Sequence, residues 1–473
     1  MGESITFIHS GDVHLGAPFR GVRALSPAWA DRLVQAIPEA YDRAIDAAIA
    51  RDVDFMLLAG DVFDTDKPSY AHYRRFLEGL RRLDAAGIPA YMIAGNHDPY
   101  PNWRDVVESL PENARLFGSD EPTYFLHERS GRASAVIAAR GFSNHPQEGN
   151  IAAGMTRSAA LASVAEHAGS VPAAPFVVGM LHTGLWMDPY KAPADEGALL
   201  AAGMDYWALG HIHKRYQTPD SDPKLAYCGC IQGRDIKETG DRGCFCVTLS
   251  AGEPNALEFI PTESVEWERL SVDVSRAAGV EDVLQACVRA MFDANAAASC
   301  DEMIARVTLC GSTPLHATLS QPGFVEDLRA DLNDRYPSFY CDALIDETQA
   351  PVDRLALERE GLFPATFLRI VRERVQGGPS AQAAQEAFGR KNGRSAAPLA
   401  AAAAVGERAA GEGSRAAVDG GDVDIAPLDV PAFVRDEFSA RGLVMPEGAR
   451  IDARKTTERA VDIVLDLLGK RGS

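Results

Sequence analysis

The polar segment Ala94-Gly95-Asn96-His97-Asp98 follows directly on the apolar run Tyr91-Met92-Ile93. An apolar run of this kind predicts a buried strand, so an amide, an imidazole and a carboxylate are expected at the carboxyl end of one strand. Four other apolar runs end in the same way, and they lead into Gly11-Asp12-Val13-His14, Gly60-Asp61, Leu181-His182 and Gly210-His211-Ile212-His213. Five strand ends are therefore predicted to bring metal-binding side chains to one edge of the fold.

Composition indicates a globular protein. The chain has 473 residues, of which 46% are apolar and 24% charged, enough for two or three domains. The amino terminus lacks the pattern of a signal peptide, and no run is long and apolar enough to span a bilayer. Eight cysteines are too few for a secreted disulfide framework. We expect a cytoplasmic protein without a membrane span.

The net charge of −20 argues against tight, extended DNA binding by this chain alone. Nonspecific affinity for nucleic acid comes from Lys and Arg side chains that neutralise phosphates. Divalent cations bound at the strand ends would place positive charge where a phosphate must lie. Metal binding would therefore partly reconcile the acidic chain with a nucleic-acid substrate.

Residues 1–262 are predicted to form one large α/β domain. Its first hundred residues show a β-α-β-α-β order, which favours a largely parallel, helix-covered sheet. One helix is expected to begin near Pro38 and to continue through Ile49, and another covers 70–86. From about 116 to 262 short strands prevail, apart from a helix over 150–168, which predicts a second sheet packed on the first.

The rest of the chain is divided by composition. Residues 265–345 are predicted to form a small α/β capping domain, with strands at 266–274 and 303–309 and helices at 280–297 and 323–336. A helical segment over 346–375 is a candidate for partner binding. An Ala/Gly-rich linker is expected over 376–428, followed by a carboxyl-terminal helical segment over 429–473.

The spacing of the polar residues favours a metal site. Asp12 and His14 are two apart, as are His211 and His213, and side chains two apart share one face of an extended strand. The carboxylate of Asp61 has two oxygens and is the natural bridge between two cations. Oxygen and imidazole ligands without thiolate favour Mn, Fe or Zn.

A weaker alternative is a structural zinc site formed by thiols. Cys228, Cys230, Cys244 and Cys246 form two Cys-X-Cys pairs, each with both side chains on one face of a strand. Against this, small buried cysteines are common in strands. His9 is expected to be a core histidine and not an additional ligand.

The polar motifs resemble those of a known family. Gly11-Asp12-Val13-His14, Gly60-Asp61-Val62-Phe63-Asp64, Gly95-Asn96-His97-Asp98, Leu181-His182-Thr183-Gly184 and Gly210-His211-Ile212-His213 are similar to the five signature motifs of the calcineurin-like metallophosphoesterases. The resemblance covers residues 5 to about 262 and implies a four-layer αββα sandwich. Residues 205–214 resemble the SbcD-like DNA repair exonucleases. Ile231-Gln232-Gly233-Arg234 and Lys237-Glu238-Thr239-Gly240 look closer still to the YhaO-type bacterial branch.

The resemblance also assigns roles to residues. It implies that Asp12, His14, Asp61 and His213 hold one metal ion, while Asp61, Asn96, His182 and His211 hold the other. His97 would face the scissile phosphate, either to stabilise the transition state or to protonate the leaving oxygen. Asp98 is expected to orient the His97 ring, and the alternative is that Asp98 caps its own loop.

The function implied by the resemblance is hydrolysis of DNA phosphodiester bonds, as in repair exonucleases, with a hydroxide held between two divalent ions such as Mn as the nucleophile. The same resemblance implies two partners besides DNA: an SbcC-like coiled-coil ATPase and a second copy of the chain in a homodimer. Two alternatives remain open from the sequence. A phosphatase or a small-nucleotide phosphodiesterase would use the same ligands, and a noncatalytic scaffold would keep the fold.

Overall fold

The computed structural model describes residues 3–19, 26–103, 110–129, 131–143, 150–168, 176–188, 192–336 and 339–351. The chain divides into two compact units, Met1–Thr348 and Gln349–Ser473, and the second is described only up to residue 351. The predicted linker over 376–428 and helical segment over 429–473 lie outside the described residues, as does the predicted helical segment 346–375 beyond residue 351. The start of that last segment is wrong, because residues 346–349 end the strand β15 (Phe339–Gln349). The rest of these three expectations remains a prediction.

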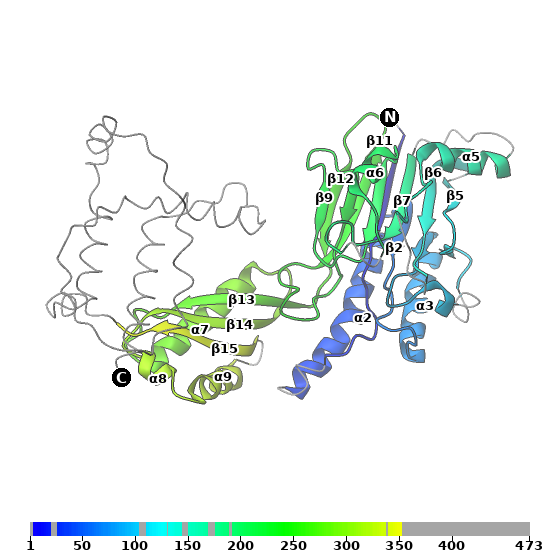
Figure 1. Cartoon of the computed structure of the whole chain (residues 1–473). Coiled ribbons are helices and arrows are strands. Elements are labelled where there is room, and N and C mark those ends of the chain that lie inside the picture. Colours follow the sequence, from blue (N-terminus) through cyan, green and yellow to red (C-terminus); the bar gives the residue numbers. More distant parts are fainter. Residues whose placement is uncertain are drawn as a thin grey trace, which may run out of the picture. The chain divides into compact units, whose positions relative to one another are not determined.

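Two large β-sheets dominate the described part of residues 3–262 (Figure 1). The first, in the order β12-β11-β1-β2-β3-β4, has a parallel centre from β1 to β4. The second, in the order β5-β6-β7-β8-β10-β9, is parallel from β6 through β10. The first sheet consists of β1 (Ser4–Ser10), β2 (Phe55–Ala59), β3 (Ala90–Ile93), β4 (Ala114–Leu116), β11 (Gly243–Ser250) and β12 (Ala256–Pro261). The second consists of β5 (Thr123–Arg129), β6 (Arg132–Arg140), β7 (Phe176–His182), β8 (Tyr206–Gly210), β9 (Tyr216–Thr218) and β10 (Leu225–Tyr227).

Side chains that point alternately to the two faces of each sheet produce the layers of the domain. Phe7 and Leu57 of the first sheet pack with Val178 and Ala208 of the second, in a core between the sheets. Their neighbours face the opposite way, because successive side chains of a strand point to opposite faces. Met56, for example, packs against the helices outside the first sheet.

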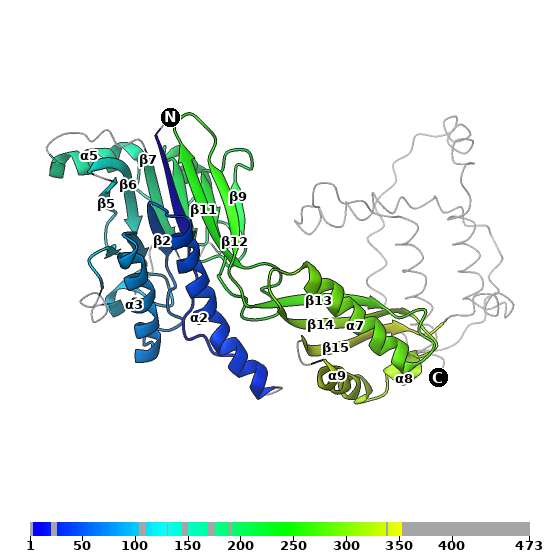
Figure 2. The same cartoon turned by 180° about the vertical axis from the view of Figure 1, so that it is seen from behind.

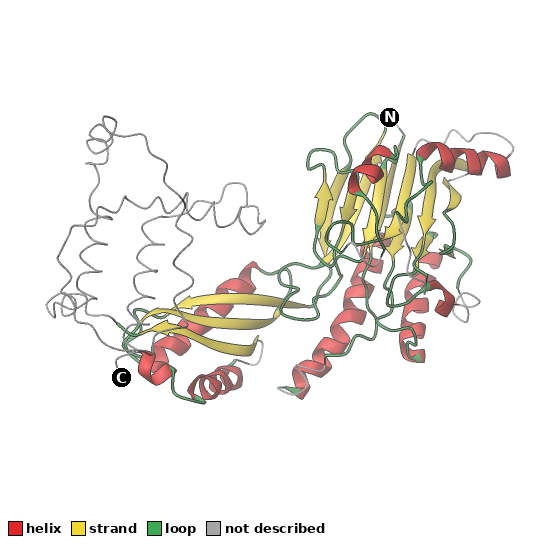
Figure 3. Ribbon diagram, viewed as in Figure 1, coloured by secondary structure: helices red, strands yellow, loops and turns green. Residues whose placement is uncertain are grey.

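Helices cover both outer faces. On the first sheet lie α2 (Pro27–Ala50) and α3 (Tyr70–Ala85), which pack side by side (Figure 2). The second sheet is covered by α5 (Arg157–Ala168) and α6 (Glu196–Ala201). The predicted four-layer αββα arrangement is thus confirmed (Figure 3).

The predicted start of the first long helix is wrong. The helix α2 begins at Pro27, and the Ser26 hydroxyl accepts a hydrogen bond from Trp29 N at 3.4 Å, as an N-cap does. Pro27 occupies the first turn, where its missing N–H costs nothing. Pro38 lies inside the same helix. The helix predicted over 150–168 is also shorter, because it begins at Arg157.

Residues 265–349 contain a three-stranded sheet in the order β13-β14-β15. Its strands are β13 (Val265–Asp273), β14 (Glu302–Ser312) and β15 (Phe339–Gln349), and its helices are α7 (Val280–Ala297), α8 (His316–Leu319) and α9 (Phe324–Arg335). Leu284, Val307 and Leu328 belong to a core of this region's own. The region also contacts α2, where Arg32 pairs with Glu302 at 2.5 Å and Trp29 stacks on Tyr340.

Candidate metal centre

The predicted ligands lie just beyond the carboxyl ends of their strands, except His182, the last residue of β7. β1 ends at Ser10, β2 at Ala59 and β8 at Gly210, so the extended geometry expected for the pairs Asp12–His14 and His211–His213 is wrong. Four of the predicted ligands have a positive φ: Asp12 (50°), His14 (54°), Asp61 (50°) and His211 (100°). Left-handed backbone in residues other than glycine is costly and gathers at functional sites.

Glycine makes the close approach of these loops possible. A Cβ at Gly95 would overlap the carboxylate and backbone of Asp61, which lies on the neighbouring loop. Gly60 has φ +94°, and a Cβ there would overlap the His182 ring. Both positions therefore require glycine.

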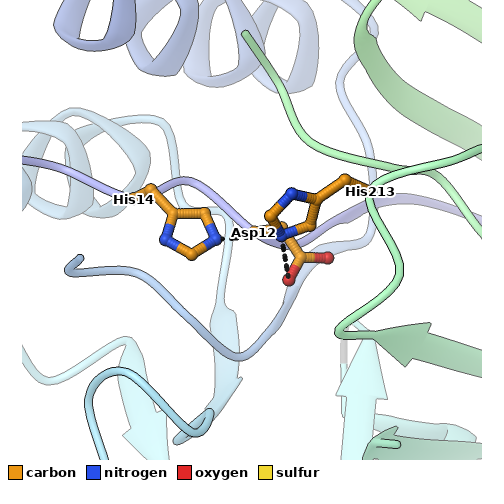
Figure 4. A group of neighbouring side chains, drawn as sticks. All are labelled: Asp12, His14 and His213. Atoms are coloured by element: carbon orange, nitrogen blue, oxygen red, sulfur yellow. Dashed lines mark hydrogen bonds and ion pairs between the residues drawn. The ribbon is translucent and has the colours of Figure 1, made fainter. Parts of the chain in front are cut away.

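One group of candidate ligands consists of Asp12, His14 and His213, whose ligand atoms lie within 4.8 Å of one another (Figure 4). His14 Nε2 lies 3.1 Å from His213 Nε2, which in turn lies 3.7 Å from Asp12 Oδ1. Both oxygens of Asp12 accept from the backbone N–H of His211, at 3.0 and 3.1 Å. The three side chains come from two separate loops and face one small volume.

The other ring nitrogens of this group are held by carboxylates. His14 Nδ1 lies 3.0 Å from Asp64 Oδ1, and His213 Nδ1 lies 2.6 Å from Glu238 Oε1. Because a carboxylate only accepts hydrogen bonds, each Nδ1 carries a ring proton, and Nε2 is the nitrogen left to bind a metal ion. The two Nε2 atoms lie 3.1 Å apart, and either a proton or a cation between them satisfies both nitrogens. This donor set therefore fits a metal ion.

A second group consists of Asn96, His182 and His211. Asn96 Oδ1 lies 3.1 Å from His182 Nε2 and 2.7 Å from His211 Nδ1. The far nitrogen of each ring is again occupied: His182 Nδ1 donates to Ala59 O at 2.9 Å, and His211 Nε2 donates to Asp188 Oδ2 at 3.0 Å. The near nitrogens and the amide oxygen thus converge, as metal ligands would.

Asp61 joins the two groups. Its Oδ2 lies 3.7 Å from His14 Nε2 and 3.4 Å from His182 Nε2. Its Oδ1 accepts from His97 N at 2.8 Å, which fixes the carboxylate in place. The position predicted for a bridging ligand is therefore occupied by a fully buried carboxylate that touches both groups.

The electrostatics of the site suit cations. Burial lowers the pKa of His14 to about 4 and that of His211 to about 4, so both rings are neutral at neutral pH. Burial would raise the pKa of Asp61, but the imidazoles of His182 and His14 hold it well below its usual range. Burial likewise lowers the pKa of His182, yet the Asp61 carboxylate outweighs this and raises it to about 9. A cation would replace the proton shared by His182 and Asp61, because metal ligands must be deprotonated.

Arg234 links the carboxylates that orient the first group. Its guanidinium donates to Asp64 Oδ1 at 3.0 Å and to Glu238 Oε1 at 3.2 Å. It also lies 3.0 Å from His213 Nδ1, but the 2.6 Å contact with Glu238 assigns a proton to that nitrogen, so the guanidinium does not donate to it. Burial alone would raise the pKa of Glu238, whereas His213 and Arg234 hold it well below its usual range. Glu238 is therefore a carboxylate at neutral pH.

His97 lies at the edge of the site. Its ring meets the His14 ring edge to face at 4.8 Å between centroids, and its side chain is 39% exposed. Its Nδ1 lies 3.1 Å from Asp64 O, and because a carbonyl only accepts, Nδ1 carries a proton. Among the described residues Nε2 has no hydrogen-bond partner, so this atom is open to a substrate.

The structure corrects the role predicted for Asp98. Its carboxylate accepts from Gly95 N at 2.8 Å, from Val62 N at 2.8 Å and from Phe63 N at 3.0 Å. It does not orient the His97 ring, which is held by the carbonyl of Asp64. Asp98 instead fixes two ligand-bearing loops to each other, and the alternative of a loop cap describes it better.

The thiols do not assemble as a zinc site. All four cysteines of the two Cys-X-Cys pairs are buried and free. In the described part of the chain, the one group of metal-type ligands with a thiol combines Cys230 with His213 and Glu238. Cys230 Sγ lies 3.8 Å from Glu238 Oε2, so this thiol packs behind a carboxylate that holds His213. His9 is a core histidine, with its ring 2.8 Å from the Tyr206 hydroxyl.

Sequence reasoning missed the residues that orient the ligands. Asp64 and Glu238 occur within motifs that pointed to the family, but nothing in their spacing gave them a role. Asp188 lies in the loop after β7 and carries no sequence signal at all. A search for carboxylates near each predicted histidine needs the fold, because His14 and Asp64 are 50 residues apart.

Comparisons with known proteins identify the family to which the chain is similar. Residues 5–215 match the family model for calcineurin-like phosphoesterases, and residues 267–349 match the model for the middle domain of the metallophosphoesterase YhaO. The uncharacterized metallophosphoesterase YhaO of Bacillus subtilis is 36% identical over 289 residues, which cover 60% of this chain and 67% of that protein. The DNA double-strand break repair protein Mre11 of Aeropyrum pernix is 25% identical over 307 residues, or 63% of this chain and 70% of that protein. Mre11 of Thermoplasma acidophilum is 35% identical over 274 residues, 54% of this chain and 65% of that protein.

Proposed function

Because this chain belongs to the calcineurin-like phosphoesterases, in the branch of YhaO, and is a metal-dependent phosphoesterase, we propose that it hydrolyses phosphodiester bonds of DNA with a pair of divalent cations. The observation that carries the proposal is the position of Asp61, whose Oδ2 lies 3.7 Å from His14 and 3.4 Å from His182. A carboxylate between two ligand groups suits a two-metal site.

We propose that seven residues hold that pair of cations. Asp12, His14 and His213 would hold one cation, Asn96, His182 and His211 the other, and Asp61 both. When bound, such cations supply Lewis acidity, which makes a nucleophile available at neutral pH and offsets charge on the phosphoryl oxygens. Manganese is the metal we propose, because imidazole, amide and carboxylate ligands suit it.

His97 would act on the phosphate. Its Nδ1–H is fixed on Asp64 O, so the ring is held in one orientation and Nε2 faces outward. In the imidazolium form, Nε2–H can donate to a phosphoryl oxygen or pass its proton to the leaving oxygen. Because Asp64 also holds His14, one residue positions both a ligand and the group proposed to meet the substrate.

DNA as the substrate is supported by the relatives named as DNA double-strand break repair proteins. The net charge of −20 gives the chain little general attraction for a polyanion. Cations at the site would supply the local positive charge instead. We therefore propose that DNA binds at the metal centre and that the affinity of the protein for DNA depends on the bound metal.

The experiment compares four substrates with purified protein and Mn²⁺: linear duplex DNA, single-stranded DNA, bis-nitrophenyl phosphate and nitrophenyl phosphate. We expect cleavage of DNA and of the diester, with little action on the monoester. An Asp61→Ala protein purified in the same way controls for contaminating nucleases. Cleavage of the monoester with intact DNA would indicate a phosphatase, and cleavage of the small diester alone would indicate a small-nucleotide phosphodiesterase.

We also propose that the chain works as a homodimer with a coiled-coil ATPase of the SbcC kind, as the resemblance of its nuclease motifs implies. The candidate contact segments, 355–371 and the carboxyl-terminal helical region, lie outside the described residues. Size-exclusion chromatography of the chain, alone and mixed with such an ATPase from the same cell, tests both parts. Elution of a monomer in both runs would contradict them.

A further inference from the structure

A second cluster of acidic side chains lies where β12 passes into β13. Asp241, Glu263 and Glu266 each offer a carboxylate oxygen, and these oxygens lie within 4.8 Å of one another. Glu263 is 1% exposed and Glu266 is 8% exposed, whereas the side chain of Asp241 reaches solvent. Carboxylates so close together, two of them buried, repel each other and lose hydration.

One oxygen of the cluster has no partner. Glu263 is well bonded, because the Ser299 hydroxyl donates to its Oε1 and Arg242 N donates to its Oε2 at 2.9 Å. Glu266 Oε2, in contrast, is buried and accepts no hydrogen bond from any described residue. A buried polar atom without a partner calls for an explanation, and an ion is one.

Within the described part of the chain, no positive side chain is paired with the cluster. Among the described residues, neither Arg nor Lys forms a salt bridge with Asp241, Glu263 or Glu266. Arg43 lies nearby, but its guanidinium donates to the backbone carbonyl of Glu263 and not to the carboxylate. Burial, followed by the charges of Asp241 and Glu263, raises the pKa of Glu266 to about 7. The cluster therefore needs either a proton or a cation.

We propose that Asp241, Glu263 and Glu266 form a separate binding site for a hard divalent cation of the Ca²⁺ or Mg²⁺ class. The donors are all carboxylate oxygens, which such cations prefer, and the exposed side of Asp241 leaves room for water as further ligands. The ion would remove the repulsion among the three carboxylates and would compensate the buried carboxylate of Glu266, whose Oε2 has no hydrogen-bond partner among the described residues.

The site would join two parts of the molecule. Glu266 belongs to β13, at the start of the three-stranded sheet, whereas Asp241 ends the segment that carries Glu238. The same two stretches already touch, since Gly240 N donates to Trp267 O at 3.1 Å. A cation there would tie the small sheet to the segment whose Glu238 holds His213.

The experiment uses the full chain with Asp61→Ala as the background, so that Ca²⁺ binding at the catalytic centre is weakened in every protein compared. Equilibrium dialysis measures bound Ca²⁺, and thermal unfolding measures its effect on Tm. We expect a Ca²⁺ site in the background protein, with affinity lowered at least about 10-fold by Glu266→Gln and by Asp241→Asn. Ca²⁺ should raise Tm by roughly 3 °C or more in the background protein and by much less in either variant.

Glu268→Gln is the matched control, because it removes a nearby negative charge, which also raises the pKa of Glu266, from the same strand without removing a member of the cluster. It should retain Ca²⁺ binding and the Tm shift. The proposal is overturned if the background protein binds no Ca²⁺, if both cluster variants bind it as the background does, or if Glu268→Gln weakens binding equally. A rise in Tm on Glu266→Gln that does not depend on Ca²⁺ would show that a proton fills the role assigned to the cation.

Discussion

His14 Nε2 and His213 Nε2 lie 3.1 Å apart, and each ring uses its other nitrogen to donate to a carboxylate. The two histidines are 199 residues apart in the sequence. Asp64 and Glu238 thus hold the two Nε2 atoms toward each other, in position to bind a common cation. The outer carboxylates should therefore determine metal affinity almost as strongly as the ligands do.

Glu238→Gln tests this directly. The amide can still accept from His213 Nδ1, but it lacks the charge that makes the ring a better ligand, so Mn²⁺ affinity should fall roughly 10- to 100-fold. Glu253→Gln is the control, because Glu253 is an exposed carboxylate in the turn after β11. Titration calorimetry with Mn²⁺ measures both. Equal Mn²⁺ affinities of the two variants would show that Glu238 does not contribute to metal binding.

Asp61→Ala should lower the occupancy of both metal positions and abolish hydrolysis, because this carboxylate touches both ligand groups. His213→Ala should mainly empty one position, since His213 belongs to one group only. Metal analysis of the dialysed proteins distinguishes the two results. An Asp61→Ala protein that keeps two metals and a near-normal rate contradicts the bridging role.

His97→Asn should separate chemistry from metal binding. Since His97 Nδ1 is fixed on Asp64 O and Nε2 is open, metal content should not change while turnover falls roughly 100- to 10,000-fold. If His97 protonates the leaving oxygen, the loss should be smaller for a nitrophenyl diester than for DNA. If it stabilises charge, the two losses should be similar. Loss of a metal on this substitution would show that His97 is a ligand.

Acid should destabilise the protein through His9. Burial lowers the pKa of His9 to about 4 from an ordinary 6.5, and the hydrogen bond from Nε2 to Leu209 O offsets only part of this effect. In the neutral ring, Nδ1 accepts from the Tyr206 hydroxyl. Between pH 6.5 and about 4 the unfolded chain binds a proton that the folded chain does not. The contribution of His9 to the free energy of unfolding is thus complete above pH 6.5 and is lost as pH falls. The loss between pH 7.5 and 5 is about 2 kcal/mol.

His9→Gln removes this titration, so its free energy of unfolding should change less between pH 7.5 and 5 than that of the natural protein. Urea unfolding at the two pH values provides the measurement. His316→Gln, in the small α/β region, is the control and should keep the natural pH dependence. An unchanged pH dependence in His9→Gln would mean that other groups account for acid sensitivity.

The fold, and the set of polar residues that meet at one edge of it, could be predicted because both depend on short-range patterns. Apolar runs such as Tyr91-Met92-Ile93 are buried strands, and the carboxyl ends of parallel strands meet at one edge. The backbone at the site could not be predicted in the same way. Asp12 and Asp61 adopt left-handed conformations that propensity disfavours and that surrounding contacts impose.

Residue roles that depend on long-range contacts could not be predicted from the sequence either. Asp98 stands next to His97 in the chain but bonds to the backbone of the Asp61 loop, while Asp64 orients His97 from 33 residues away. Pro38 gave a plausible helix start, yet tertiary packing on the first sheet continues α2 through it. Neighbours in sequence were a poor guide to neighbours in the site.

The central claim is that two cations joined by Asp61 carry out phosphodiester hydrolysis. The direct test is to titrate metal-free protein with Mn²⁺ and to measure bound metal and the rate on bis-nitrophenyl phosphate and on linear DNA in the same samples. The account predicts that hydrolysis of both substrates develops as the second equivalent binds. Full activity at one equivalent, or no hydrolysis with two equivalents bound, would contradict it.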